Sequence, residues 1–96
     1  MYGMIGKIKA KPGERTALAA ILAGGTGSMP GCISYVVAED VVDVDGLWVT
    51  ELWDSKAAHD ASLTLPAVKD AIAKGRPLIA GFDVHAETRP LSGVKA

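Results

Sequence analysis

The segment ELWDSKAAHDASL, residues 51–63, brings a carboxylate, an indole and an imidazole close together in the chain. His59 is one of only two histidines, and histidine is the side chain whose ordinary pKa best suits proton transfer near neutral pH. Glu51 falls in a stretch that alternates like a strand, where a buried carboxylate is costly unless it is paired or takes part in acid-base chemistry. We therefore take His59 and Glu51 as candidate catalytic residues.

Each of these residues also has a structural alternative. His59 could be a solvated helical histidine beside Asp60. Glu51 could form an ion pair with Arg76 or Arg89 across a subunit interface, which would offset the cost of burying its charge. The direction of the His59 side chain, into a pocket or into solvent, separates the two interpretations.

Aromatic residues are the candidates for holding a flat substrate. Trp48 and Trp53 lie five positions apart on one predicted strand, so their side chains point to opposite faces of the sheet. Trp53 would share its face with Glu51, and Tyr35 could donate a hydrogen bond to an oxygen of the substrate. Packing in the core or between subunits is the alternative for all three.

Two other groups of residues carry less chemistry. Asp83, His85 and Glu87 alternate on the last predicted strand, but no second histidine joins them, so we expect a polar face or a dimer contact and no metal. Cys32 is expected to be a small buried apolar group, because no basic neighbour is present to activate its thiol.

Apolar periodicity predicts the elements that position these residues. The expected strands are Tyr2 to Ala10, Cys32 to Glu39, Leu47 to Trp53 and Ile79 to Arg89. A helix is expected from Glu14 to Gly24, and a second from Asp54 or Ser55 to Gly75, split at Pro66. On the last strand, Phe82, Val84 and Ala86 are expected on one face and Asp83, His85, Glu87 and Arg89 on the other. The order β-α-β-β-α-β is the ferredoxin-like α+β fold with an antiparallel sheet.

Length and composition bound the function. The 96 residues predict one domain, residues 1–90, followed by a flexible tail, residues 91–96. The net charge is −1 and no basic stripe is present, which argues against nucleic acid as a partner. No segment resembles a signal peptide or a membrane span, and the single cysteine suits the cytoplasm. Helices would cover only one face of the sheet, so we expect a homodimer through the other face.

Three segments, KPGE, MPGCISYVV and LWVTELWDSKAAHDASL, resemble the antibiotic biosynthesis monooxygenase domain family in sequence and spacing, over roughly Met4 to Pro90. The resemblance implies a dimeric α+β barrel with a pocket between sheet and helices in each subunit. It also implies a cofactor-independent oxygenase of a small phenol or quinol.

The resemblance extends to individual residues. Glu51 and Trp53 match the family's Glu-x-aromatic pattern, whereas Ser62 stands where many members carry a histidine. His59 lies one helical turn before Ser62 and is the expected base. The expected substrate contacts are Tyr35, Trp48, Trp53, Ser62 and Phe82. The chain contains no asparagine, which argues against an asparagine-based mechanism and haem degradation.

Two other functions remain open at this point. A non-oxidative enzyme, such as an isomerase acting on a small metabolite, predicts a small wet pocket. A non-catalytic ligand-binding or assembly domain predicts a filled core with His59 in solvent. Oxygenation predicts an apolar cavity with His59 inside it.

Overall fold

The computed structural model describes residues 1–24 and 29–92. Along the chain it forms β1 (Tyr2–Ala10), α1 (Arg15–Gly24), β2 (Cys32–Glu39), β3 (Gly46–Trp53), α2 (Lys56–Ser62), α3 (Pro66–Gly75), the short 3₁₀ helix η1 (Arg76–Leu78) and β4 (Ile79–Thr88). This order confirms the predicted ferredoxin-like α+β fold, with the second helical segment divided in two. The last four residues of the predicted tail, 93–96, lie outside the described residues.

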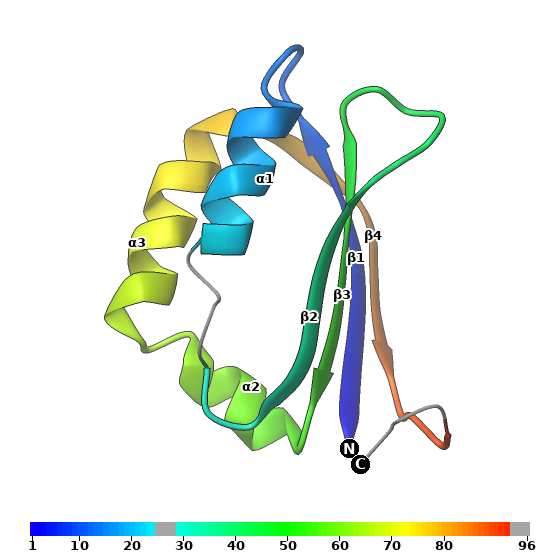
Figure 1. Cartoon of the computed structure of the whole chain (residues 1–96), viewed down its shortest axis with the longest axis vertical. Helices are drawn as coiled ribbons and strands as arrows, with labels where there is room; N and C mark the ends of the chain where they lie inside the picture. The colour runs from blue at the N-terminus through cyan, green and yellow to red at the C-terminus, as the bar shows by residue number, and fades with distance from the viewer. Residues whose placement is uncertain (25–28, 93–96) are drawn as a thin grey trace.

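The four strands form one antiparallel sheet in the order β2-β3-β1-β4. Figure 1 shows the helices gathered on one side of this sheet, while the other side is uncovered. None of the helices within the described residues is long and apolar enough to cross a membrane. The fold therefore has two sheet faces of different character: one packs against helices, and the other is open.

Local signals explain why the helical segment after β3 breaks where it does. The Ser55 hydroxyl accepts a hydrogen bond from the backbone N–H of Ala58 and caps α2, as predicted. Pro66 occupies the first turn of α3, where its missing N–H and fixed φ are harmless. Gly31 has φ of 80°, and a Cβ at this position would approach the Ala58 Cβ to 2.6 Å. The turn before β2 can thus pack directly against α2 only because position 31 is glycine.

Two clusters of buried side chains lie between the helices and the sheet. The first centres on Leu18 of α1 and Leu47 of β3, which are almost fully buried. The second, at the α2 end, contains Tyr2, Met29, Trp53 and Val68. Trp53 has no exposed surface and is the largest fully buried side chain. The second cluster forms the floor beneath the candidate site.

The predicted alternation of β4 breaks between Phe82 and Val84, because the strand contains a bulge, although Val84 and Ala86 share one face and His85 and Glu87 the other, as predicted. Ile8 pairs with Phe82 and Lys7 with Val84, so Asp83 is an extra residue in the ladder. Val84 consequently lies on the open face, where Lys7 contacts Asp83 at 3.5 Å between Nζ and Oδ2. His85 pairs with Gly6 on the helix-facing side. The bulge therefore places Asp83 and His85 on opposite faces, and no group of three metal-binding side chains forms among the residues that the structure describes.

The open face of the sheet carries apolar side chains from every strand. Val36, Thr50, Ile5 and Ala86 pair in one row across it. Trp48 also lies on this face, and its indole N–H donates to the Asp40 carboxylate at 2.8 Å. Asp40 accepts further hydrogen bonds from the backbone N–H groups of Val42 and Asp43. These bonds hold the pKa of Asp40 well below its usual range, so its charge is available to anchor Trp48.

Candidate functional site

An inner cavity of about 140 Å³ lies between the sheet and the helices, next to the second core cluster. Its polar groups come from Tyr35, Glu51, His59 and Ser62, and the rest of its wall is aliphatic, aromatic or thioether. The full lining is Met4, Leu22, Met29, Tyr35, Glu51, Trp53, His59, Ser62, Leu63, Val68, Ala71 and Ile72. The cavity is thus an apolar chamber with a few converging polar groups, the usual make-up of a small-molecule site.

Glu51 enters this chamber from the middle of β3. Because β3 residues alternate in direction, Glu51 shares the helix-facing side with Trp53, and only 9% of its surface is exposed. Its Oε1 accepts a hydrogen bond from the Trp53 indole N–H at 3.0 Å. Burial raises the pKa of Glu51, although the Trp53 hydrogen bond and the charges of His59 and His85 oppose that rise. The environment therefore favours the protonated, neutral carboxyl more than water does.

His59 points into the chamber from α2. Its side chain is 12% exposed, and its Nε2 lies 3.9 Å from Glu51 Oε1. The imidazole also contacts the Trp53 ring edge-on, with centroids 5.5 Å apart, and the Tyr2 ring at 5.4 Å. A separation of 3.9 Å is too long for a direct hydrogen bond, so a hydroxyl group placed beside both side chains can bond to either. The His59 side chain therefore points into the pocket and not into solvent.

Asp60 determines which nitrogen of His59 faces the chamber. His59 Nδ1 lies 3.0 Å from Asp60 Oδ1, and this contact is the main reason that the pKa of Asp60 is lowered. A carboxylate can only accept, so the neutral imidazole donates from Nδ1 and keeps the lone pair on Nε2. His59 is thereby oriented as a proton acceptor toward the cavity. Asp60 acts through His59, and we regard it as a positioning residue.

Tyr35 completes the polar side of the chamber. It lies on β2 opposite Glu51, with which it is paired across the sheet. Burial raises the pKa of Tyr35 well above its usual range, and the Glu51 carboxylate adds to the rise. Tyr35 therefore keeps its proton and can act only as a hydrogen-bond donor or acceptor.

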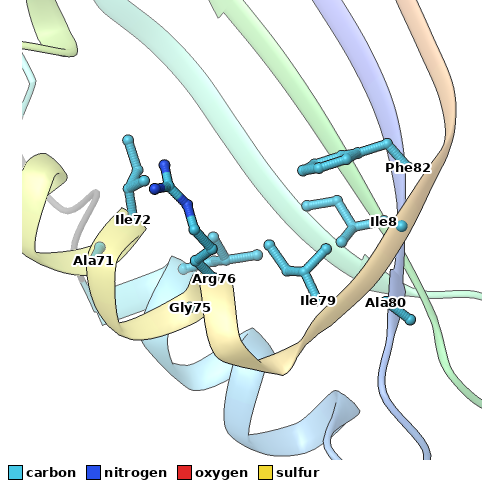
Figure 2. A pocket seen from close by; sticks show the side chains of 10 residues that line it. Ile8, Ala71, Ile72, Gly75, Arg76, Ile79, Ala80 and Phe82 are labelled. Carbon is cyan, nitrogen blue, oxygen red and sulfur yellow. The ribbon is translucent and has the colours of Figure 1, made fainter.

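An outer cleft of about 620 Å³ adjoins the inner cavity, with which it shares Leu22, Ala71 and Ile72. Figure 2 shows this cleft between α3 on one side and the start of β4 on the other, with Phe82 and Ile79 pointing into it. Apart from Arg76, its lining consists of glycine, alanine and large apolar residues: Ile8, Leu22, Ala71, Ile72, Gly75, Ile79, Ala80, Gly81 and Phe82.

The predicted site residues therefore divide by location. His59, Glu51, Tyr35, Trp53 and Ser62 all line the inner cavity. Phe82 lines the outer cleft instead and is 70% exposed. Trp48 reaches neither cavity, because it lies on the open face of the sheet. Within this subunit the neighbours of Glu51 are Trp53 and His59, and the ion pair to Arg76 or Arg89 across a subunit interface stays a prediction.

Sequence reasoning missed three contributors to the site. Met29 lies in the loop before β2, where no periodicity signals burial, yet it lines the cavity. Tyr2 packs against His59 from the first position of β1, and burial raises its pKa to about 12, with a further contribution from Glu87. Asp60 was considered only as a solvated neighbour of His59, although an acid next to a histidine is the available signal for a positioning residue.

Replacing Glu51 by glutamine is expected to stabilise the protein at neutral pH. Since the folded-state pKa of Glu51 lies above its ordinary value of 4.5, the native protein binds more protons than the unfolded chain between these two values. The free energy of unfolding of the wild type should fall as the pH rises through this window. A glutamine side chain at this position can still accept from the Trp53 indole but carries no charge.

The free energy of unfolding of Glu51→Gln should therefore exceed that of the wild type by an amount that increases with pH between the two pKa values and is constant above them. In urea unfolding this difference should reach on the order of 1 kcal/mol. Glu39→Gln serves as the matched control, since Glu39 is an exposed carboxylate bound to Arg15. The control should change stability by less than about 0.5 kcal/mol at every pH. A Glu51→Gln protein less stable than the wild type at pH 8 would contradict a burial-raised pKa.

Comparison with known proteins agrees with the fold. The profile of the antibiotic biosynthesis monooxygenase family matches residues 1–74. A crystal structure from Chloroflexus aurantiacus J-10-fl that carries this family's name is 61% identical, with a TM-score of 0.96, and covers 98% of this chain and 96% of its own. No curated protein matches the chain.

More distant structures share the same fold. Rv0793 from Mycobacterium tuberculosis is 24% identical, with a TM-score of 0.81 and 98% coverage of both chains. A Deinococcus radiodurans protein with the family's name is also 24% identical, with a TM-score of 0.80, covering all of this chain and 98% of its own. The fold is that of a small ferredoxin-like α+β protein, with a cavity between its sheet and helices. The chain belongs to the antibiotic biosynthesis monooxygenase family.

Proposed function

We propose that the protein is a cofactor-independent monooxygenase that oxidises a small phenol or quinol with O₂. The observation that carries the proposal is the inner cavity, where a carboxyl and an imidazole face an apolar chamber of about 140 Å³. An apolar cavity of about 150 Å³ admits one benzene molecule, so the chamber fits a single aromatic ring. The enclosed, mainly apolar wall favours this function over an isomerase with a wet pocket, and the inward His59 favours it over a non-catalytic domain.

The first step of the proposed reaction is proton removal from the ring hydroxyl. His59 accepts this proton at Nε2, because its Nδ1–H is engaged by Asp60. The resulting imidazolium lies 3.9 Å from Glu51 Oε1, whose negative charge would stabilise it. Tyr35, which keeps its proton, is the donor available to oxygen atoms of the ligand.

The substrate itself then supplies the electrons. The ring anion reduces O₂, and a bond forms between a ring carbon and one oxygen atom. The second oxygen atom leaves as water, so a phenol and O₂ yield a quinone and water, while a quinol and O₂ yield a hydroxyquinone and water. The protein's part is to deprotonate the ring, hold it and exclude water, and no metal or organic cofactor enters the scheme.

Oxygen uptake by the wild type with a panel of phenols and quinols tests the proposal. Substrates with one ring should be consumed with one O₂ per molecule, and the reaction should cease under nitrogen. A panel in which no compound is oxidised faster than in buffer would overturn it.

The single thiol suits a reducing compartment, and a cytoplasmic location is part of the same proposal.

A homodimer joined through the open sheet faces is the second part of the proposal. The supporting observations are the row of Val36, Thr50, Ile5 and Ala86, and the half-buried Trp48 on the same face. A second copy related by a two-fold axis would cover these side chains with the same set. The uncovered face shown in Figure 1 fits the sheet-to-sheet pairing expected from the family resemblance.

Val36→Lys is expected to weaken dimerisation by at least about 100-fold, because it would bury an unpaired ammonium between the sheets. Val36 is 50% exposed in the single subunit, so the lysine is tolerated there. Val41→Lys is the matched control, since Val41 is 99% exposed in the loop between β2 and β3. Sedimentation equilibrium distinguishes the outcomes: equal dissociation constants for the two variants would exclude this face as the interface.

A further inference from the structure

The outer cleft presents a single charged group to an otherwise apolar surface. Arg76, at the start of η1, is the only ionisable side chain among its lining residues. Figure 2 shows Arg76 rising from the end of α3 into the cleft, beside Ile72 and across from Phe82. No hydrogen bond or ion pair of its guanidinium occurs in the part of the chain that the structure describes. The cleft therefore combines apolar walls with one guanidinium that has no ion-pair partner among the described residues.

The cleft adjoins the site of the proposed reaction. Leu22, Ala71 and Ile72 line both cavities, so a ligand with its ring in the inner chamber would pass these side chains to reach the cleft. The two volumes, about 140 Å³ and about 620 Å³, differ by more than fourfold. A ligand that is only one ring would fill the chamber and leave water in the cleft. The apolar walls of the cleft offer that water no hydrogen bonds. A longer molecule would bury that surface as well.

We propose that the substrate is an aromatic acid, with its hydroxylated ring in the inner cavity, an apolar linker in the outer cleft and a carboxylate bound to Arg76. This inference rests on the proposed function for the placement of the ring. A guanidinium is the side chain best suited to bind a carboxylate, because its planar fork donates two parallel hydrogen bonds. The low polarity of the cleft strengthens that interaction relative to water.

Binding of a carboxylate by Arg76 predicts different affinities for two nearly identical ligands, one with and one without a negative charge. A hydroxyphenyl-pentanoic acid should bind the wild type roughly tenfold more tightly than its methyl ester, since only the acid can form charge-assisted hydrogen bonds with the guanidinium. Arg76→Gln should remove this difference by weakening the acid and leaving the ester unchanged. Lys74→Gln makes the same change of charge nearby, but Lys74 pairs with Asp70 at 2.9 Å and does not line the cleft. It should leave the preference intact.

The experiment measures the affinity of acid and ester by calorimetry under nitrogen, where no oxidation occurs. In a Trp48→Phe background, the remaining fluorescence comes from Trp53, which lines the inner cavity, and the acid should alter it. Equal affinities of acid and ester for the wild type would overturn the inference, as would equal effects of Arg76→Gln and Lys74→Gln. Arg76-dependent binding without a change in Trp53 fluorescence would also overturn it. Failure of oxygen uptake in air with intact acid binding would count against the proposed function alone.

Discussion

A protein carrying His59→Gln is expected to consume O₂ about 10²- to 10⁴-fold more slowly than the wild type with any substrate that the wild type oxidises. The physical reason is the loss of the imidazole that Asp60 orients with its Nε2 lone pair toward the chamber. Glutamine fills similar space and remains polar, so the contacts with Tyr2 and Trp53 should largely survive. Ligand affinity measured under nitrogen should change only a few-fold.

His85→Gln is the matched control, because His85 is the other histidine and lies on the exposed β4 strand. This variant should retain oxygen uptake within about twofold of the wild type, since its side chain lines neither cavity. Asp60→Asn should have an intermediate effect and shift the pH dependence of the rate, because an amide can also donate to Nδ1 and would permit the other tautomer. Equal rates for the wild type and His59→Gln would remove His59 from the mechanism.

The largest loss of stability is expected for Trp53→Ala. Trp53 is fully buried, and truncation of a buried tryptophan costs about 3–5 kcal/mol through lost burial and the cavity left behind. The variant also deprives Glu51 Oε1 of its hydrogen-bond donor at 3.0 Å. Urea unfolding at one fixed protein concentration is the measurement, since association contributes to apparent stability.

Phe82→Ala provides the matched aromatic truncation. Phe82 is 70% exposed, so the control should lose less than about 1 kcal/mol. The contrast tests whether the second core cluster, rather than aromatic content in general, holds the α2 end of the fold together. Similar losses for the two variants would contradict the burial of Trp53.

The sequence predicted the fold because its local signals agree with one another. Period-two alternation marked β1 and β3, Ser55 marked the start of α2, and Pro66 marked the break before α3. The same alternation placed Trp53 and Glu51 on one face and Trp48 on the other, as the pairing of β1 with β3 confirms. These features depend on neighbours in the chain, which a sequence displays directly.

The parts that escaped prediction depend on partners distant in sequence. The extra residue at Asp83 reverses the alternation of β4, and its cause is pairing with Lys7 and Ile8 in β1, which no local pattern reveals. The inward direction of His59 follows from the packing of α2 against Gly31 and β1, so periodicity alone could not decide it. The sequence predicted one pocket and no second cavity, so it could not separate Phe82, which lines the outer cleft, from the residues of the inner cavity.

The alternation of β3 has a consequence for how such a protein can change over time. Val49, Glu51 and Trp53 face the helices, while Trp48, Thr50 and Leu52 face the open side. Single substitutions can therefore alter the inner cavity and the open face separately, even though both are lined by the same eight-residue strand. An insertion or deletion within the strand has no such freedom, because a slip of one residue exchanges the two faces. Relatives should thus vary β3 by substitution while keeping its length.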